Sequence, residues 1–342
     1  MQLLNTLYVT TQRAYLHLDH DTVRVDVEGS TKLQVPLLHL GAMVCFGDVA
    51  VSTALLNRCA EDGRSVVFMD RGGRFRARVE GPVSGNVLLR RAQHLTLSDD
   101  DRVLAIARNM VAGKIQNSRQ VLLRAARETS EQPSAYALGI AAEGLSAFLN
   151  LVETSRALDP LRGYEGEAAA TYFAVFDHLI REDPEAFALG GRTRRPPLSR
   201  MNALLSFIYA LLRTDCVAAL EGVGLDPQVG YLHALRPGRP ALGLDLMEEL
   251  RAVMADRLAL SLVNRRQLQR DDFVVRDGGA VSLADDARKV VVIAYQKRKQ
   301  EDVQHRALKR KIPFGMVPHV QARLLARTLR GDLEHYPPYL YR

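Results

Sequence analysis

Residues 230–251 read GYLHALRPGRPALGLDLMEELR, a loop rich in glycine and proline followed by the start of a predicted helix. Leu246, Leu250 and Val253 recur at the three- and four-residue spacing that places apolar side chains on one helix face. His233 lies on the loop, and loops held in place by a rigid element often carry function. This stretch therefore joins a helical scaffold to a candidate functional residue.

The predicted helix carries three acids in its first turn, Asp245, Glu248 and Glu249. Asp245 is three residues before Glu248 and four before Glu249, so either pair can share a helix face and approach one cation. Close carboxylates repel each other unless a proton or a metal ion lies between them. With His233 nearby, the donor set suits Mg²⁺, Mn²⁺ or Zn²⁺. The alternative is that these acids are solvated and only interact with the helix dipole.

A second unusual segment, residues 161–173, reads LRGYEGEAAATYF. Glycines flank Tyr164 and Glu165, and three alanines follow, so this segment can approach another backbone closely. A carboxylate in such a crowded place needs a partner, and a metal ion shared with His233 would supply one. The alternative is that Glu165 is a first-turn acid that interacts with the helix dipole. We expect Glu167, on a different helix face, to lie at the surface.

The composition is that of a globular protein. The chain has 342 residues, of which 47% are hydrophobic, enough for two domains with packed cores. Lys and Arg total 46 against 39 for Asp and Glu, a net charge of +7 that favours phosphate-bearing partners. The three cysteines are widely spaced, which excludes a disulfide framework and a zinc ribbon.

The sequence shows no membrane or export signal. Residues 1–11 alternate in polarity and lack the charged start and apolar block of a signal peptide. The longest uncharged apolar run, residues 201–212, is shorter than the ~20 residues that a membrane helix needs. We expect a cytoplasmic protein without a membrane partner.

The N-terminal part of the chain has the pattern of short strands. Valines alternate with charged residues over 23–27, which is typical of a half-buried strand. Arg71-Gly72-Gly73 separates two further strand-like runs and predicts a hairpin. Residues 51–60 favour one short helix. We therefore predict a small β domain over residues 1–85, followed by a linker over 86–94.

The rest of the chain, residues 95–342, predicts a larger all-helical domain. Ser98 followed by three aspartates is typical of a helix N-terminus, and helical spacing continues through Arg127. One late hairpin is predicted around residues 277–279. Residues 297–299 and 309–311 are basic and lie a few helical turns apart, which would give either one basic ridge or an ordinary solvated surface. The predicted fold class is α+β, with a strand-rich domain followed by a helical one.

Basic side chains give candidate contacts to a phosphate backbone. Lys114 and Arg119 lie with Asn117 on one predicted helix, and Arg194 and Arg195 lie on a proline-containing loop. Positive side chains of this kind bind phosphate oxygens without regard to sequence. The alternative for both groups is an ordinary solvated surface.

Three blocks of sequence share their order and spacing with one known family. They are the segment 161–173, residues 194–209 (RRPPLSRMNALLSFIY), and residues 232–249. Together they resemble the CRISPR-associated adaptation endonuclease and integrase, the Cas-one family. Within that family, the sequences of the blocks are most similar to the type I-C branch. The resemblance covers essentially the whole chain and includes the order of a β domain and a helical domain. One departure is Ser199, which stands where the family usually has Asp and concerns local hydrogen bonding.

The resemblance implies a metal-dependent active site. Glu165, His233 and Glu248 match the family's ligands for Mg²⁺ or Mn²⁺, Asp245 matches an additional catalytic acid beside them, and Glu249 matches no ligand. The implied chemistry is phosphoryl transfer on DNA. Attack by water gives cleavage, and attack by the 3′ hydroxyl of a short duplex gives integration into a repeat array.

The resemblance also implies partners. Family members form homodimers through the β domain and assemble with a small second CRISPR adaptation protein, Cas-two, in a heterohexamer on double-stranded DNA. The DNA-contacting residues we expect are Lys114, Arg119, Arg194, Arg195, Tyr209, Arg236 and Arg239. Two alternatives stay open. One is a DNA-binding scaffold without catalysis, and the other is a metal-dependent nuclease that acts on branched DNA in repair.

Overall fold

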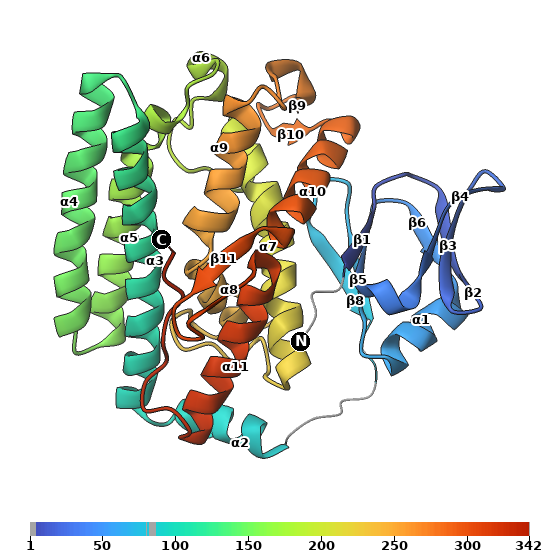
Figure 1. Cartoon of the computed structure of the whole chain (residues 1–342), viewed down its shortest axis with the longest axis horizontal. Coiled ribbons are helices and arrows are strands. Elements are labelled where there is room, and N and C mark those ends of the chain that lie inside the picture. The colour runs from blue at the N-terminus through green and yellow to red at the C-terminus, as the bar shows by residue number, and fades with distance from the viewer. Residues whose placement is uncertain (1–4, 80, 82–86, 342) are drawn as a thin grey trace.

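A computed structural model of the chain describes residues 5–79, 81 and 87–341. A strand-rich N-terminal region lies beside a larger helical region, as Figure 1 shows. The predicted α+β fold class, with strands first and helices after, is confirmed.

In its described residues, the N-terminal region forms two four-stranded sheets and one helix. The sheet order β1-β5-β7-β8 and the sheet order β4-β3-β2-β6 are built from β1 (Asn5–Val9), β2 (Ala14–Asp19), β3 (Thr22–Val27), β4 (Ser30–Pro36), β5 (Leu40–Phe46), β6 (Val49–Val51), β7 (Ser65–Met69) and β8 (Phe75–Val79). Helix α1 (Thr53–Glu61) packs on them. Val23 and Val25 of β3 are buried, as the alternating pattern predicts, and β7 and β8 form the predicted antiparallel hairpin.

The predicted linker over residues 86–94 is wrong for most of its length. Helix α2 spans Val87–Thr96, and residue 86 lies outside the described part of the chain. Leu89 of α2 belongs to the core of the helical region. Gln93 is fully buried, donates to the Asp226 carbonyl at 2.8 Å and accepts from the Asp226 N–H at 2.9 Å. The packing of Leu89 and the hydrogen bonds of Gln93 make α2 part of the helical region.

The remaining elements are mainly helical. They are α3 (Asp100–Glu128), α4 (Gln132–Thr154), α5 (Leu158–Ala174), α6 (Pro184–Phe187), α7 (Arg200–Val223), α8 (Ala241–Glu248), a π-helical segment (Arg251–Asp256), α9 (Arg257–Asn264), β9 (Phe273–Val275), β10 (Val281–Leu283), α10 (Asp285–Gln300), β11 (Asp302–His305), β12 (Arg310–Pro313) and α11 (Val317–Arg330). Asp99, not Ser98, caps α3 through a hydrogen bond from the Arg102 N–H at 3.0 Å.

The late hairpin is confirmed as antiparallel β9 and β10. A second hairpin, β11 with β12, was not predicted. It places residues 310 and 311 on a strand, so residues 297–299 and 309–311 form no continuous helical ridge.

Helix α7 runs through the core of the helical region. By length and composition alone, α4 and α7 are apolar enough to cross a membrane. In α7 that apolar surface is packed against α8, α11 and the π-helical segment. Helix α4 lies at the edge of the molecule farthest from the N-terminal sheets, against α3 and α5 (Figure 1).

The two regions meet through specific side chains. The rings of Phe46 in β5 and Phe207 in α7 are 5.7 Å apart. Lys299 of α10 lies 3.0 Å from Asp215 of α7 and 3.4 Å from the Thr6 hydroxyl in β1. These contacts fix one face of the helical region against the β1-containing sheet.

The C-terminal segment returns along α3 after α11 (Figure 1). Asn117 of α3 is fully buried and donates to the carbonyls of Glu249 and Tyr339 at 2.7 and 2.8 Å. The side-chain oxygen Oδ1 of Asn117 accepts a hydrogen bond from the Tyr341 N–H at 2.8 Å. Gly113 permits this close approach, because a Cβ there would lie 2.9 Å from Pro338 Cβ. The segment thereby ties α3 to the end of α8.

Candidate active site

The acids of α8 do not lie in its first turn. The helix begins at Ala241, so Asp245 is in the second turn and Glu248 is the last residue. Asp245, Glu248 and Glu249 have 0, 3 and 0% of their surface exposed. Solvated acids at a helix N-terminus are therefore excluded as an explanation. A buried carboxylate near a helix C-terminus faces an unfavourable dipole and depends on specific partners.

Asp245 organises the loop that carries His233. Its carboxylate accepts hydrogen bonds from the backbone N–H groups of residues 231–233 at 2.7, 3.0 and 3.0 Å. The same carboxylate lies 2.6 Å from His233 Nδ1. Gly230 makes room for it, since a Cβ there would be 2.8 Å from Asp245 Oδ2. A carboxylate bound to one imidazole nitrogen fixes the tautomer and leaves the other as a ligand. That other nitrogen, Nε2, lies 3.8 Å from Glu248 Oε1.

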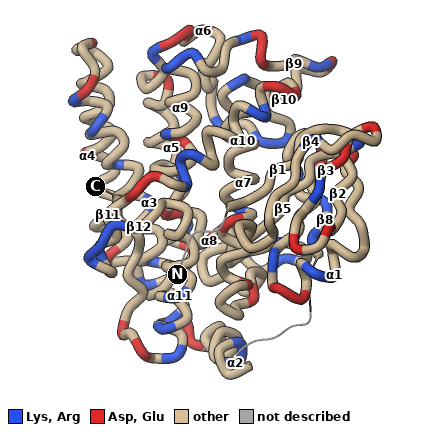
Figure 2. The backbone as a smooth tube through the Cα atoms, turned by 45° about the vertical axis from the view of Figure 1, so that its right-hand side comes forward, with Lys and Arg blue, Asp and Glu red and all other residues tan. Residues whose placement is uncertain are grey.

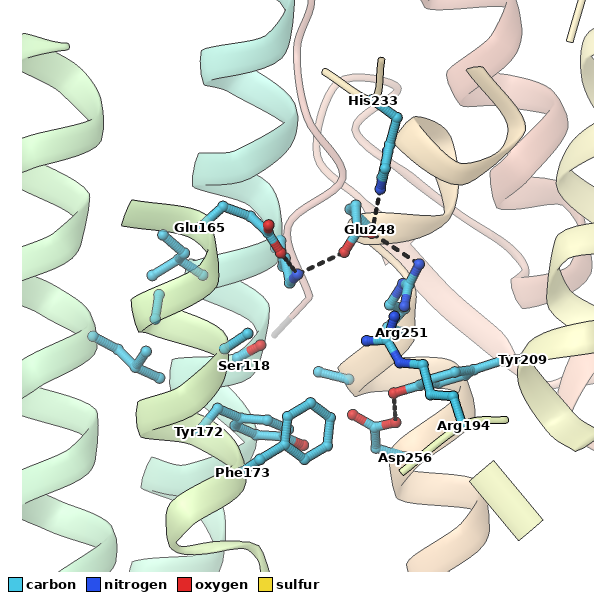
Figure 3. Close-up of a pocket in the computed structure, with 16 residues that line it drawn as sticks. Ser118, Glu165, Tyr172, Phe173, Arg194, Tyr209, His233, Glu248, Arg251 and Asp256 are labelled. Atoms are coloured by element: carbon cyan, nitrogen blue, oxygen red, sulfur yellow. Dashed lines mark hydrogen bonds and ion pairs between the residues drawn. The ribbon is translucent and has the colours of Figure 1, made fainter. Parts of the chain in front are cut away.

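Glu165 and Glu248 face each other across the site, with His233 approaching from the loop (Figure 3). Glu165 is in the third turn of α5, which begins at Leu158, so it is not a first-turn acid. The ammonium of Lys114 from α3 lies between the two carboxylates, in contact with Glu165 and 2.8 Å from Glu248 Oε2. Arg251 reaches Glu248 Oε1 at 2.8 Å.

These neighbours set the charge of Glu248. Burial acts to raise its pKa, but the charges of Arg251, Lys114 and His233 outweigh burial and lower the pKa to about 2. Glu248 is therefore ionised at neutral pH. Its buried Oε2 atom is paired with the Lys114 ammonium at 2.8 Å, so a metal ion at this atom would have to take the place of that ammonium.

The donor chemistry fits Mg²⁺ or Mn²⁺, since two carboxylates and one imidazole nitrogen converge from three elements. As the side chains stand, no three His, Cys, Asp or Glu residues in the described part of the chain lie close enough to share an ion. Lys114 takes the central position instead.

A cavity of about 130 Å³ extends from the acids toward Tyr209 and Asp256 (Figure 3). The Tyr209 hydroxyl donates to Asp256 Oδ1 at 2.6 Å. The guanidinium groups of Arg192 and Arg251 lie 5.3 and 5.1 Å from the centre of the Tyr209 ring. Cation–π contacts and the hydrogen bond together hold the ring in one orientation.

Asp256 belongs to the π-helical segment. Arg251 and Asp256 are five residues apart, which is the hydrogen-bond repeat of a π-helix, and both line the cavity. Burial raises the pKa of Asp256 to about 6, against the opposing effect of the hydrogen bond from Tyr209. The π-helical repeat thus places the Arg251 guanidinium and the Asp256 carboxyl at the same cavity.

The expected DNA-contacting residues have different surroundings. Lys114, Arg194 and Tyr209 line the cavity with the acids, whereas Arg195 and Arg236 are exposed outside it and Arg239 is half-buried. The Arg119 side chain donates to the Ala142 carbonyl of α4 at 3.2 Å and so joins two helices. Lys and Arg positions are spread over both regions and do not gather on one element (Figure 2).

The polar cavity residues Arg251, Asp256 and Tyr172 were not selected from the sequence. Arg251 is three residues after Glu248, and only this spacing offered a signal in the sequence. Asp256 reaches the cavity through the π-helical segment, and Tyr172 reaches it from α5. Ser199, which departs from the family's pattern, caps α7, because its hydroxyl accepts from the Asn202 N–H at 3.3 Å.

Glu249 points away from the cavity. It accepts hydrogen bonds from the Tyr336 hydroxyl at 2.7 Å, the Tyr339 N–H at 2.6 Å and Gln321 Nε2 at 2.9 Å. Burial raises its pKa to about 8, partly offset by these donors. Glu249 anchors the C-terminal segment, in agreement with its lack of a ligand role in the resemblance.

Comparisons with known proteins identify the family of the chain. A family model described as CRISPR associated protein Cas1 matches residues 7–297. The CRISPR-associated endonuclease Cas1 1 of Moorella thermoacetica is 62% identical over 340 residues, which cover 99% of both chains. The CRISPR-associated endonuclease Cas1 2 of Rhodospirillum rubrum is 51% identical over 345 residues, which cover 100% of this chain and 99% of that one.

Two solved structures share the fold. A casposase bound to an integration product matches with a TM-score of 0.84 and 18% identity, over 99% of this chain and 95% of that chain. A complex described as Cas6-RT-Cas1 with Cas2 contains a chain that matches with a TM-score of 0.83 and 23% identity, over 99% of this chain and 36% of that one. At these identities the likeness concerns the fold alone.

Proposed function

Because the chain belongs to the Cas1 family of CRISPR-associated proteins, we propose that it is a metal-dependent DNA endonuclease and integrase. It joins the 3′ hydroxyl ends of short duplex DNA into a repeat array by transesterification. The observation that carries this proposal is the convergence of Glu165, Glu248 and His233 Nε2 on one cavity that also holds positive side chains.

Glu165, Glu248 and His233 would hold Mg²⁺ or Mn²⁺, and the bound ion supplies positive charge to a phosphate oxygen. Asp245 keeps the His233 ring in the orientation that presents Nε2 to the site. Arg251 and Arg194 offer charge and hydrogen-bond donors to a phosphate at the cavity. The same residues serve water and a 3′ hydroxyl as nucleophiles, because only the attacking oxygen differs.

The proposed partners are double-stranded DNA, a second copy of the chain bound through the β region, and a small second adaptation protein in a heterohexamer. The net charge of +7 supports phosphate binding. The Cas6-RT-Cas1 complex with Cas2 and the casposase bound to an integration product support a role in assembly with Cas2 and in integration. We also propose a cytoplasmic location, supported by three buried free cysteines.

A strand-transfer assay tests the proposal. A short duplex with 3′ hydroxyl ends is incubated with the protein, Mn²⁺ or Mg²⁺, the second adaptation protein, and a supercoiled plasmid that carries the cognate repeat. Joining that requires the metal and is abolished by 3′-deoxy ends supports integration. Cutting of branched DNA without joining favours a repair nuclease, and DNA binding that no metal converts to cleavage or joining favours a scaffold.

A further inference from the structure

Lys114 lies at the centre of the site, in a place that a surface DNA contact does not require. Its side chain is 14% exposed, and its ammonium contacts Glu165 of α5 and Glu248 of α8 at the same time. Arg251, a second cation at the site, contacts Glu248 but makes no ion pair with Glu165 among the described residues. Lys114 is therefore the group that bridges the two elements.

Electrostatics explain why a cation sits there. Glu248 is buried and Glu165 faces it, so two carboxylates this close need positive charge between them. The compact ammonium of lysine on a flexible four-carbon stem can fill this position and can also leave it by rotating its own side-chain bonds. The backbone of Lys114 is held independently, since Gly113 and Asn117 fix α3 against the C-terminal segment.

We propose that Lys114 is the resident cation of the metal-free site, and that a divalent metal ion and the Lys114 ammonium compete for the space between Glu165 and Glu248. The proposal rests on the proposed function, because it takes the metal ligands from there. In the metal-free protein the ammonium keeps the two carboxylates together. When a metal ion binds, the Lys114 ammonium moves toward the cavity, where it can form an ion pair with a DNA phosphate.

Two consequences follow. Metal binding to the protein alone is weakened, because an ion pair must be broken first. Metal and DNA then bind with positive coupling, because a phosphate accepts the displaced ammonium, and such coupling is reciprocal. Lys114 thereby makes metal loading depend on the presence of DNA.

Mn²⁺ binding, followed by the electron paramagnetic resonance signal of the free ion, tests this without any activity measurement. We expect Lys114→Met to bind Mn²⁺ about tenfold more tightly than wild type without DNA, and to lose most of the increase in affinity that a short duplex gives wild type. Lys289→Met is the matched control, since Lys289 is an exposed lysine paired with exposed Asp286. It should behave as wild type.

Two results overturn the inference. If Lys114→Met binds Mn²⁺ no more tightly than wild type, while Glu165→Gln abolishes binding, the metal site stands and the competition is wrong. If Glu165→Gln binds Mn²⁺ as wild type does, the ligand assignment fails, and the competition fails with it.

A second measurement uses the wild-type chain and so does not depend on the folding of a variant. An amine-reactive reagent should acylate Lys114 slowly in the metal-free protein and several-fold faster after Mn²⁺ is added, as measured by peptide mass spectrometry. The rate at Lys289 should stay unchanged. An equal rate at Lys114 with and without saturating Mn²⁺ would contradict the displacement.

Discussion

His233 Nδ1 lies 2.6 Å from Oδ1 of Asp245, whose carboxylate also binds the backbone of residues 231–233. One buried side chain thus fixes both the path of the loop and the orientation of the ring. The position of Nε2, the nitrogen that faces Glu248, depends on an acid that need not touch the metal or the DNA.

Asp245→Asn should therefore weaken metal binding. The amide removes the negative charge that orients the imidazole, and the loss of such a partner reduces metal affinity by about 10- to 100-fold. Mn²⁺ affinity measured by calorimetry on the folded variant checks this. Unchanged affinity would show that the ring does not depend on Asp245.

Asn117→Ala should destabilise the protein. The side chain is fully buried and makes three hydrogen bonds, and its loss leaves the carbonyls of Glu249 and Tyr339 unpaired. We expect a decrease of about 3 kcal/mol in the free energy of unfolding. Denaturant titration measures it, with Asn150→Ala on the exposed face of α4 as the control. A loss no larger than that of the control would contradict the role of Asn117 as an anchor.

Asp256→Asn should flatten part of the pH dependence of stability. The pKa of Asp256 is raised from 3.8 to about 6 on folding, so its contribution is fully present below about pH 4 and is lost as the pH rises through 6. The wild type should lose up to about 3 kcal/mol relative to the variant over that window. Thermal and denaturant unfolding between pH 4 and 8 checks the difference, and parallel curves would refute it.

Replacing Arg194 and Arg195 with alanine should weaken DNA binding to a similar extent on every sequence. Phosphate contacts carry no sequence information, and each one lost should reduce the slope of log affinity against log salt by about 1. Fluorescence anisotropy with several duplexes over a range of salt concentrations measures both effects. A loss confined to one sequence would indicate base contacts instead.

Local patterns predicted much of the fold. The alternation at Val23 and Val25 and the hairpin at Arg71-Gly72-Gly73 are fixed by interactions within a few residues, and both are present. The start of α8 at Ala241 was missed, because Pro240 and the glycines around it suggested a longer loop. The second hairpin was missed because strands of four residues with basic side chains have no clear period.

The site was predictable only in part. Sequence blocks selected Glu165, His233 and Glu248 as ligands and distinguished Glu248 from Glu249, and the structure places Glu249 against the C-terminal segment, away from the cavity. The position of Lys114 between two acids depends on the packing of three helices that are distant in sequence. No spacing rule covers such an arrangement.

Metal-dependent joining by a single pair of matched variants tests the central claim most directly. Glu165→Gln and Glu167→Gln make the same change on the same helix, one in the cavity and one at the surface. With Mn²⁺, the second adaptation protein and a plasmid repeat, we expect joining by folded Glu165→Gln to fall by about 100-fold or more, since metal assistance to phosphoryl transfer is lost, and Glu167→Gln to join as wild type does. Equal joining by both variants would contradict the assignment of this site.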